Sequence, residues 1–158
     1  MTPRIALALV AALAAPASAQ IARQGSITAV DPWSRATSPR ASIGAGYLTL
    51  RNTGAQADRL VSATSPRAAK VEIHTMSLDD GIMRMRPLPN GLEVPAGGEA
   101  SLAPGGHHIM LIGLKSPLKA GERIPATLRF ARAGDVRIQF KVVGAGSTVT
   151  GARQGGHQ

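Results

Sequence analysis

Three short segments of this chain pair potential metal ligands at one spacing. Each consists of a His or Met, one spacer residue and a Met; they are His74-Thr75-Met76, Met83-Arg84-Met85 and His108-Ile109-Met110. Residues two apart on a β-strand point to the same side of the sheet, so each segment can direct two side chains at one point. Imidazole and thioether groups in a chain without cysteine suit Cu(I) better than other common metals. The spacing therefore predicts a copper site carried by strands.

Hydrophobic residues alternate with the ligand candidates in two of these segments. Val71 and Ile73 share one face of one expected strand, and Ile109 and Leu111 share one face of another. Because a half-buried strand packs its apolar face on the core, we expect the His and Met side chains to occupy the opposite face. The core and the metal site would then use opposite sides of the same strands.

Other interpretations of these residues fit less well. Met is a common core filler, so the alternative is a Met-lined core with incidental histidines. However, the four methionines other than Met1 and three of the four histidines all lie within residues 74–110. Met is a poor zinc ligand, and calcium and magnesium need carboxylates, whereas Asp79-Asp80 before Gly81 is typical of a turn. A blue-copper site needs a Cys thiolate, which this chain lacks.

Short strand-like segments separated by turn residues dominate the chain. They cover residues 26–30, 46–50, 59–63, 70–76, 82–88, 92–94, 100–102, 107–114, 126–132 and 136–143. Pro89-Asn90-Gly91 is a strong turn signal, and residues 133–135 predict a tight hairpin. Beyond the N-terminal segment, no long helical period free of Gly and Pro occurs. Short strands at this spacing predict an all-β fold, an antiparallel sandwich or barrel.

The first 19 residues have the features of a signal peptide. Arg4 precedes an apolar run over residues 5–16 that is too short to span a bilayer, and Ala17-Ser18-Ala19 is a small-residue cleavage site. We therefore expect a signal peptide (1–19), a copper-binding β domain (20–143) and a flexible tail (144–158). No second apolar run of spanning length follows, and no Cys follows the cleavage site. We expect export to the periplasm without membrane insertion or lipid anchoring.

The net charge of the chain is +9, from 18 Lys and Arg against 9 Asp and Glu. These basic residues are spread along the chain, which favours solubility and a general attraction to acidic surfaces. Nucleic acid is not an expected partner, because export and only four aromatic residues argue against base stacking. No acid/base pair or nucleophile triad stands out, so we do not expect an enzyme.

The order of the candidate ligands resembles that of the PCu(A)C periplasmic copper chaperones. The signature of that family is His, ten residues, Met, about twenty-one residues, His, any residue, Met. Here ten residues separate His74 from Met85, 22 separate Met85 from His108, and Met110 follows. The extra residue fits a loop, because Gly pairs occur between Met85 and His108 and loops tolerate insertions. His107 would then point away from the site, as a structural or solvated residue.

Other stretches of the chain resemble the same family. They are residues 31–37, 45–54, 58–61, 71–74, 83–87, 104–111, 117–118 and 127–130. Together they extend the resemblance over roughly residues 26–143, nearly the whole expected domain. The resemblance implies a cupredoxin-like β-sandwich or barrel that carries one Cu(I) on its surface.

The resemblance also implies a ligand set and a role. The ligands would be His74, Met85, His108 and Met110. The protein would deliver copper to cytochrome c oxidase assembly, directly or through a thiol-bearing copper chaperone, or act in periplasmic copper homeostasis. Met76 and Met83 remain open, as transient ligands or as packing residues beside the site. His157 in the expected tail is a weak candidate for capturing Cu(II).

Two hypotheses of other classes remain open at this stage. A copper-dependent redox enzyme would turn over with a reductant and oxygen, and it would need an open site for substrate. An interaction module with a β-sandwich fold but no metal would not respond to Cu(I) in its spectrum or its stability. An anaerobic Cu(I) titration with X-ray absorption separates these hypotheses best, because it reads out the numbers of sulfur and nitrogen ligands.

Overall fold

The computed structural model describes residues 21–147 and contains eleven strands over this range. The strands are β1 (Ile21–Gln24), β2 (Ile27–Arg35), β3 (Ile43–Asn52), β4 (Asp58–Thr64), β5 (Ala68–Asp79), β6 (Ile82–Pro87), β7 (Leu92–Val94), β8 (Glu99–Leu102), β9 (His108–Leu114), β10 (Arg123–Phe130) and β11 (Gly134–Val143). The described range contains no helix, and therefore none that could cross a membrane. The all-β prediction is confirmed. The expected signal peptide, and the expected tail beyond residue 147, lie outside the described residues.

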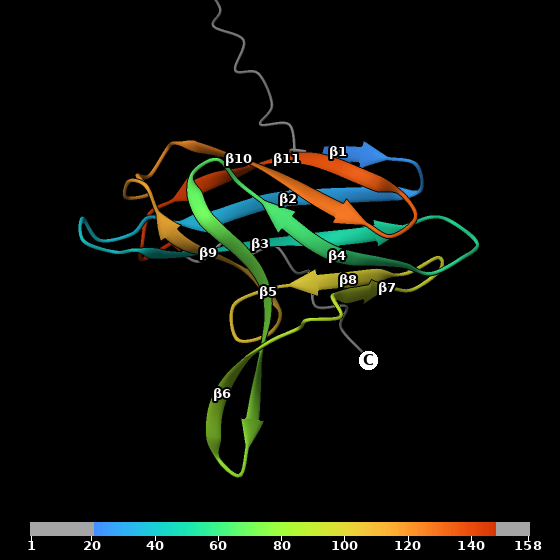
Figure 1. Cartoon of the computed structure of the whole chain (residues 1–158), viewed down its shortest axis with the longest axis horizontal. Helices are drawn as coiled ribbons and strands as arrows, with labels where there is room; N and C mark the ends of the chain where they lie inside the picture. Colours follow the sequence, from blue (N-terminus) through green and yellow to red (C-terminus); the bar gives the residue numbers. More distant parts are fainter. Residues whose placement is uncertain (1–20, 148–158) are drawn as a thin grey trace, which may run out of the picture.

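The strands form one sheet in the order β6-β5-β9-β3-β2-β11-β10-β4-β7, with β1 added to β2 and β8 added to β3. Contacts between β4 and β5, and between β7 and β8, draw the two ends of the sheet together. Figure 1 shows the resulting body, with most strands running across it in layers. Nine of the ten strand pairings are antiparallel, and the pairing of β2 with β11 is parallel. The sheet is therefore mixed at that one pairing and antiparallel elsewhere.

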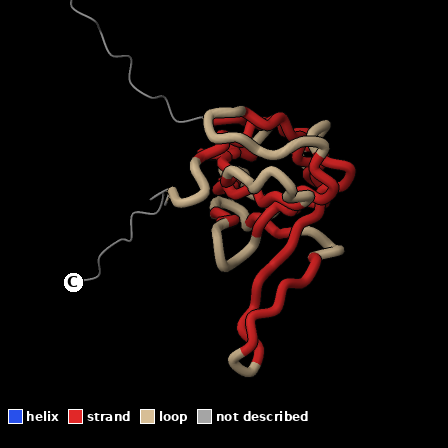
Figure 2. The backbone as a smooth tube through the Cα atoms, turned by 90° about the vertical axis from the view of Figure 1, so that its left-hand side faces the viewer, coloured by secondary structure: helices blue, strands red, loops and turns tan. Residues whose placement is uncertain are grey.

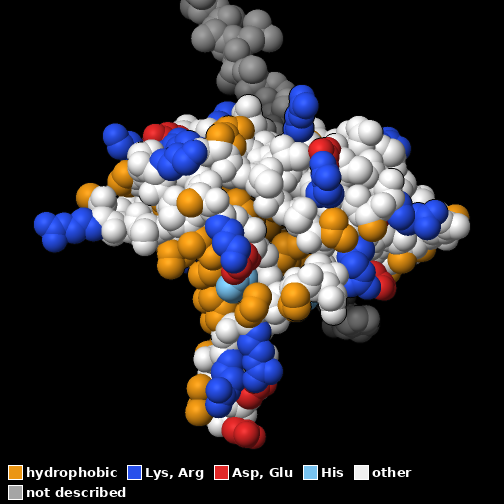
Figure 3. Space-filling model, viewed as in Figure 1, with side chains coloured by type: hydrophobic (Ala, Val, Ile, Leu, Met, Phe, Trp, Pro, Cys, Tyr) orange, Lys and Arg blue, Asp and Glu red, His pale blue; other side chains and the backbone are white. Residues whose placement is uncertain are grey.

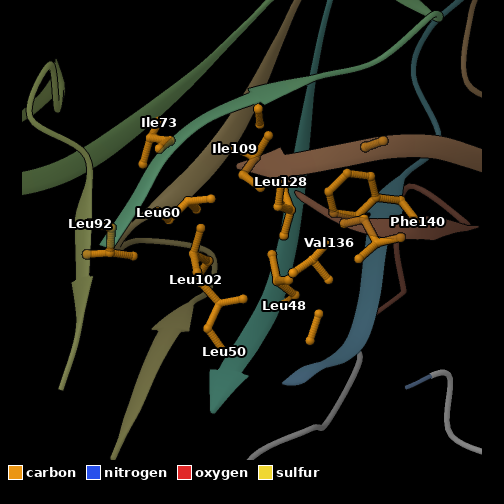
Figure 4. Packing of buried hydrophobic residues seen from close by; sticks show 14 of the residues in the cluster. Leu48, Leu50, Leu60, Ile73, Leu92, Leu102, Ile109, Leu128, Val136 and Phe140 are labelled. Atoms are coloured by element: carbon orange, nitrogen blue, oxygen red, sulfur yellow. The ribbon is translucent and has the colours of Figure 1, made fainter. Parts of the chain in front are cut away.

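One hydrophobic core fills the inside of the curled sheet. Alternate residues of the strands are buried, as in β11, whose outward neighbours are exposed. Figure 4 shows side chains from many strands meeting there, including Leu50, Ile109 and Phe140, each with no exposed surface. The ring of Phe140 packs over the backbone of β3 at Gly46, where an added Cβ would lie 2.7 Å from the ring. A glycine is thus required there by close approach.

The strand boundaries differ from the sequence prediction mainly near the N-terminus. β1 was not predicted, because its side chains are mostly exposed and leave no alternating pattern. β2 continues through Pro32 to Arg35, beyond the segment 26–30 that the sequence predicted. The pairing of β2 with β3 shifts register between Val30 and Trp33, and Asp31 has a φ of 48°. This bulge accommodates the proline within the strand, because a bulge needs no ladder hydrogen bond from it.

A long hairpin of β5 and β6 projects from the body of the domain. Figures 1 and 2 both show its far half extending well beyond the other strands. Its turn consists of Asp80 and Gly81, with φ values of 51° and 79°, as in a two-residue type I′ hairpin. The prediction of a turn at Asp79-Asp80-Gly81 is confirmed. Every residue of β6 is exposed, so this strand carries its side chains away from the core.

Candidate metal site

The pairing of β5 with β9 places three of the four expected ligands on one face. His74 lies opposite His108, and Glu72 lies opposite Met110. Between them, Ile73 lies opposite Ile109, with 5% and 0% of their surfaces exposed. Because side chains alternate along both strands, the two isoleucines enter the core while the ligand candidates face the other way. The predicted division between a core face and a ligand face is confirmed for these strands.

The pairing of β5 with β6 adds the remaining thioethers to the same face. Met76 lies opposite Met85, and Leu78 lies opposite Met83. Residues 74, 76 and 78 share a face of β5, so all six candidate side chains occupy one face of the adjacent strands β6, β5 and β9. Met83 is the most distant from the histidines, since its pair lies nearest the turn of the hairpin. Met83 is therefore a weaker candidate ligand than Met76 or Met85.

A pocket of about 270 Å³ opens between this face and the strands β2 and β3. Four ligand candidates contribute to its lining: Met76, Met85, His108 and Met110. The ring of His74 adjoins the ring of His108, with 5.8 Å between the centroids and an angle of 46° between the planes. Three of the four expected ligands thus line one pocket, and the fourth, His74, is the cross-strand neighbour of His108.

The two histidines are more deeply buried than a ligand set on an open surface would be. His74 and His108 expose 8% and 4% of their surfaces, whereas Met85 exposes 46%. The loop before β9 contributes to this cover, because the backbone N–H of Met76 donates to the carbonyl of Gly106 across 3.1 Å. The imidazoles therefore lie at the inner end of the site and the hairpin thioether at its outer end. This gradient of exposure was not expected from the sequence.

Hydrogen bonds occupy one nitrogen of each imidazole ring. His74 Nε2 lies 2.7 Å from Glu72 Oε2, and His108 Nδ1 lies 3.1 Å from the carbonyl oxygen of Gly106. The hydrogen bond from Lys70, and then the one from His74, hold the pKa of the Glu72 carboxyl below its ordinary value. His74 Nδ1 is buried and has no hydrogen-bond partner. A buried nitrogen without a partner is an available ligand atom.

The chemistry of the donors excludes a site built only from charged or imidazole ligands. Within residues 21–147, no group of three His, Cys, Asp or Glu side chains could hold a metal ion. A metal at this face must therefore draw on thioethers as well as the two imidazoles. Such a mixture suits Cu(I) and disfavours zinc, calcium and magnesium. The residues present fit a Cu(I) ion.

Two residues of the neighbouring strands add charge and polarity to the pocket. Arg35 and Tyr47 both line it, and the Trp33 ring packs against Tyr47 with 4.6 Å between ring centroids and 38° between the planes. The Arg35 guanidinium carbon lies 5.7 Å from the centroid of the Trp33 ring. Burial raises the pKa of Tyr47, and the positive charge of Arg35 partly opposes this shift. Trp33 is half-buried and does not itself line the pocket.

The opposite face of the hairpin is polar. The Asp79 carboxylate accepts a hydrogen bond from Arg86 Nη2 across 2.7 Å and has Arg84 Nε 3.9 Å away. Figure 3 shows basic and acidic side chains gathered on the hairpin, with histidine atoms visible at its base. The hairpin therefore separates a thioether face from an ion-paired face, because Met83 and Met85 alternate with the two arginines along β6.

Sequence reasoning missed Glu72, Arg35 and Tyr47 as site residues. Glu72 could have been found, because it shares the spacing of two that linked His74 to Met76. Arg35 and Tyr47 carried no such signal, since only the pairing order of β2, β3 and β9 brings them to the pocket. His107 precedes β9 and does not line the pocket. His157 lies outside the described residues.

Known proteins similar to this chain were found by sequence. The model of the LpqE-like family, described as "Putative lipoprotein LpqE-like", matches residues 27–142. "Putative lipoprotein Lxx21020" of Leifsonia xyli subsp. xyli is 42% identical over 87 residues, which are 55% of this chain and 52% of that protein. "Uncharacterized protein RP573" of Rickettsia prowazekii is 32% identical over 104 residues, 64% of this chain and 58% of that protein. The chain spans little more than half the length of these relatives.

Solved structures with the same fold include several PCuAC domains. The copper-bound PCuAC domain from PmoF2 is 24% identical with a TM-score of 0.67, over 78% of this chain and 97% of that one. The solution structure of CuI-DR1885 from Deinococcus radiodurans is 32% identical with a TM-score of 0.59, over 84% and 81% of the two chains. Its apo form is 30% identical, with the same TM-score, over 91% and 97%. These matches confirm the cupredoxin-like fold that the sequence resemblance implied.

Proposed function

We propose that this chain, which belongs to the LpqE-like family whose model matches residues 27–142, is a copper chaperone that binds Cu(I). The matches to PCuAC domains confirm the resemblance first indicated by the order of His and Met. Two of the matched structures are named as copper-bound forms, one of them specifically with Cu(I). We transfer that property to this chain because its own donors suit the same ion.

One observation carries the proposal: imidazole and thioether side chains from three adjacent strands converge on one pocket of a chain without cysteine. The proposed ligands are His74, Met85, His108 and Met110. Met76 lines the same pocket and lies opposite Met85, so it is a second thioether within the site. It either packs beside the copper or replaces Met85 during transfer.

The donor set favours release to a thiolate. Two neutral imidazoles and two thioethers leave the charge of Cu(I) uncompensated, whereas a thiolate of a recipient neutralises it. Transfer to a thiol-bearing copper chaperone, or to cytochrome c oxidase during assembly, therefore runs downhill. The exposure gradient supplies an order for this exchange: a recipient reaches Met85 on the hairpin first, and the buried histidines release the ion last. The protein binds and transfers the ion without being an enzyme.

The proposed location is the periplasm. The sequence features of residues 1–19 support export, and so does the naming of a relative as a lipoprotein. Thioether ligands suit such an oxidising compartment, because they form no disulfides and need no deprotonation to bind. Imidazole binds metal only when unprotonated, so the affinity for Cu(I) should fall as the pH is lowered.

An anaerobic Cu(I) titration with X-ray absorption tests the proposal. We expect one Cu(I) per chain, with nitrogen and sulfur ligands in equal number. His108→Ala and Met110→Ala should each weaken binding, whereas Met76→Leu, a matched thioether removal, should leave it in place. The assignment is wrong if the double variant of His108 and Met110 titrates like the wild type. A large loss in Met76→Leu would instead make Met76 a ligand.

A further inference from the structure

We propose that Glu72 is a positioning residue that makes the two histidines bind Cu(I) through different ring nitrogens, Nδ1 of His74 and Nε2 of His108. This inference rests on the proposed function and deepens it. Glu72 has no place in the ligand set, yet it shares the ligand face of β5 and lies opposite Met110 in β9. The question is what its carboxylate does there.

The carboxylate of Glu72 determines which nitrogen of His74 carries the proton. Its Oε1 pairs with the ammonium of Lys70, and its Oε2 lies 2.7 Å from His74 Nε2. An ionised carboxylate only accepts hydrogen bonds, so His74 Nε2–H must donate. The remaining nitrogen, Nδ1, is then unprotonated. It is buried without a hydrogen-bond partner and thus available to a metal ion.

The neighbouring histidine has the opposite arrangement. His108 Nδ1 lies 3.1 Å from the carbonyl oxygen of Gly106, which only accepts, so Nδ1–H donates. The available nitrogen of His108 is therefore Nε2. The rings of His74 and His108 lie 5.8 Å apart between centroids and are directly paired across β5 and β9. Opposite tautomers let two adjacent rings on neighbouring strands present unprotonated nitrogens to one ion.

Glu72 acts through His74 and not as a ligand. Both of its oxygens are already engaged, one by Lys70 and the other by His74. Residues that orient a metal-bound His in this way typically contribute a factor of about 10–100 in metal affinity. Removal of the carboxylate leaves the His74 ring free to change tautomer or to rotate. Nδ1 would then no longer be kept unprotonated.

Histidine NMR tests the proposal before and after metal binding. Two-bond ¹H–¹⁵N spectra of ¹⁵N-His protein report which ring nitrogen is protonated, and Cu(I) is diamagnetic. In the metal-free protein we expect Nε2–H on His74 and Nδ1–H on His108. Adding Cu(I) should shift Nδ1 of His74 and Nε2 of His108. The proposal is overturned if the same type of nitrogen responds in both rings.

Variants of Glu72 separate positioning from a general effect on the fold. Glu72→Ala should weaken Cu(I) binding by about 10–100-fold and mix the tautomers of His74. Glu72→Gln keeps an accepting oxygen, so it should retain the tautomer and most of the affinity. The matched control is Glu93→Ala on β7, which removes a carboxylate that Arg59 Nη2 contacts at 3.1 Å and should not change Cu(I) binding.

The outcomes distinguish this inference from the proposed function. Wild-type affinity together with the wild-type tautomer in Glu72→Ala would refute the role of Glu72 while leaving a copper chaperone intact. Failure of the wild-type protein to bind Cu(I) would refute the proposed function. In that case the tautomers of the metal-free protein alone decide whether Glu72 positions His74.

Discussion

Replacing Ile109 by Ala is expected to destabilise the domain strongly while leaving both proposed ligands beside it in place. Ile109 is the spacer of the His108-Ile109-Met110 segment and has no exposed surface. It lies opposite Ile73 in β5 and Gly46 in β3, so its side chain enters the core between these strands. The spacer therefore anchors the segment, and its neighbours on either side face the proposed metal site.

The magnitude follows from the carbon atoms removed. Ile→Ala deletes three buried carbon groups, worth about 0.8 kcal/mol each in transfer free energy, and the cavity left behind adds to this cost. We expect the free energy of unfolding to fall by about 3–4 kcal/mol. For a domain of roughly 130 residues, each kcal/mol corresponds to about 4 °C, so Tm should fall by about 12–16 °C.

Urea and thermal denaturation measure the loss, and Ile82→Ala is the matched control. Ile82 is 56% exposed beside the turn of the hairpin, so the same three carbon groups should cost at most about 0.5 kcal/mol there. At a temperature where Ile109→Ala is folded, its Cu(I) affinity should stay within about tenfold of wild type, because the backbone ladder still pairs His74 with His108. A loss below about 1 kcal/mol in Ile109→Ala would show that the faces of β9 are assigned incorrectly.

Two further predictions concern buried polar groups. Asp58→Asn should lower the free energy of unfolding by about 2–4 kcal/mol in urea, with Cu(I) affinity unchanged, because the buried carboxylate accepts three backbone N–H groups within 2.9 Å. These N–H groups belong to Arg59, Arg132 and Ala133. Arg35→Gln should raise the pKa of Tyr47 further, because it removes the charge that opposes the effect of burial. Tyr47 is the single tyrosine, so tyrosinate absorbance reports its pKa directly, and an unchanged or lower value would contradict this account. Folding raises the pKa of Tyr47, so the un-ionised phenol contributes to the stability of the folded state. This contribution is lost as the pH rises above about 10 and the phenol ionises.

Much of the candidate site could be predicted from local spacing. A strand has a side-chain period of two, so Ile109 inside requires His108 and Met110 on the other face, whatever the neighbouring strands are. The turn at Asp80 and Gly81 was also predictable from local sequence, because few residue types adopt the positive φ angles that such a turn needs. The types of ligand, and the absence of cysteine, limited the metal to one that accepts thioethers.

Features that depend on distant segments escaped prediction. The parallel pairing of β2 with β11 joins the first long strand to the last, and nothing in either segment specifies that neighbour. The bulge at Asp31 depends on the register of β2 against β3, which lets the strand continue through Pro32. The burial of His74 and His108 depends partly on the loop that contacts β5 through Gly106.

The sequence by itself determined which side chains share a face and which metal they suit, because alternation and donor chemistry are local properties. Only the tertiary structure decided how they meet. It paired β5 with β9, brought Met85 to the pocket on a projecting hairpin, and set Glu72 against His74. It also placed Arg35 from β2 at the same pocket. These placements arise from the order and register of the strands. Many strand pairings are equivalent in local terms, and the packing of the whole core selects one of them.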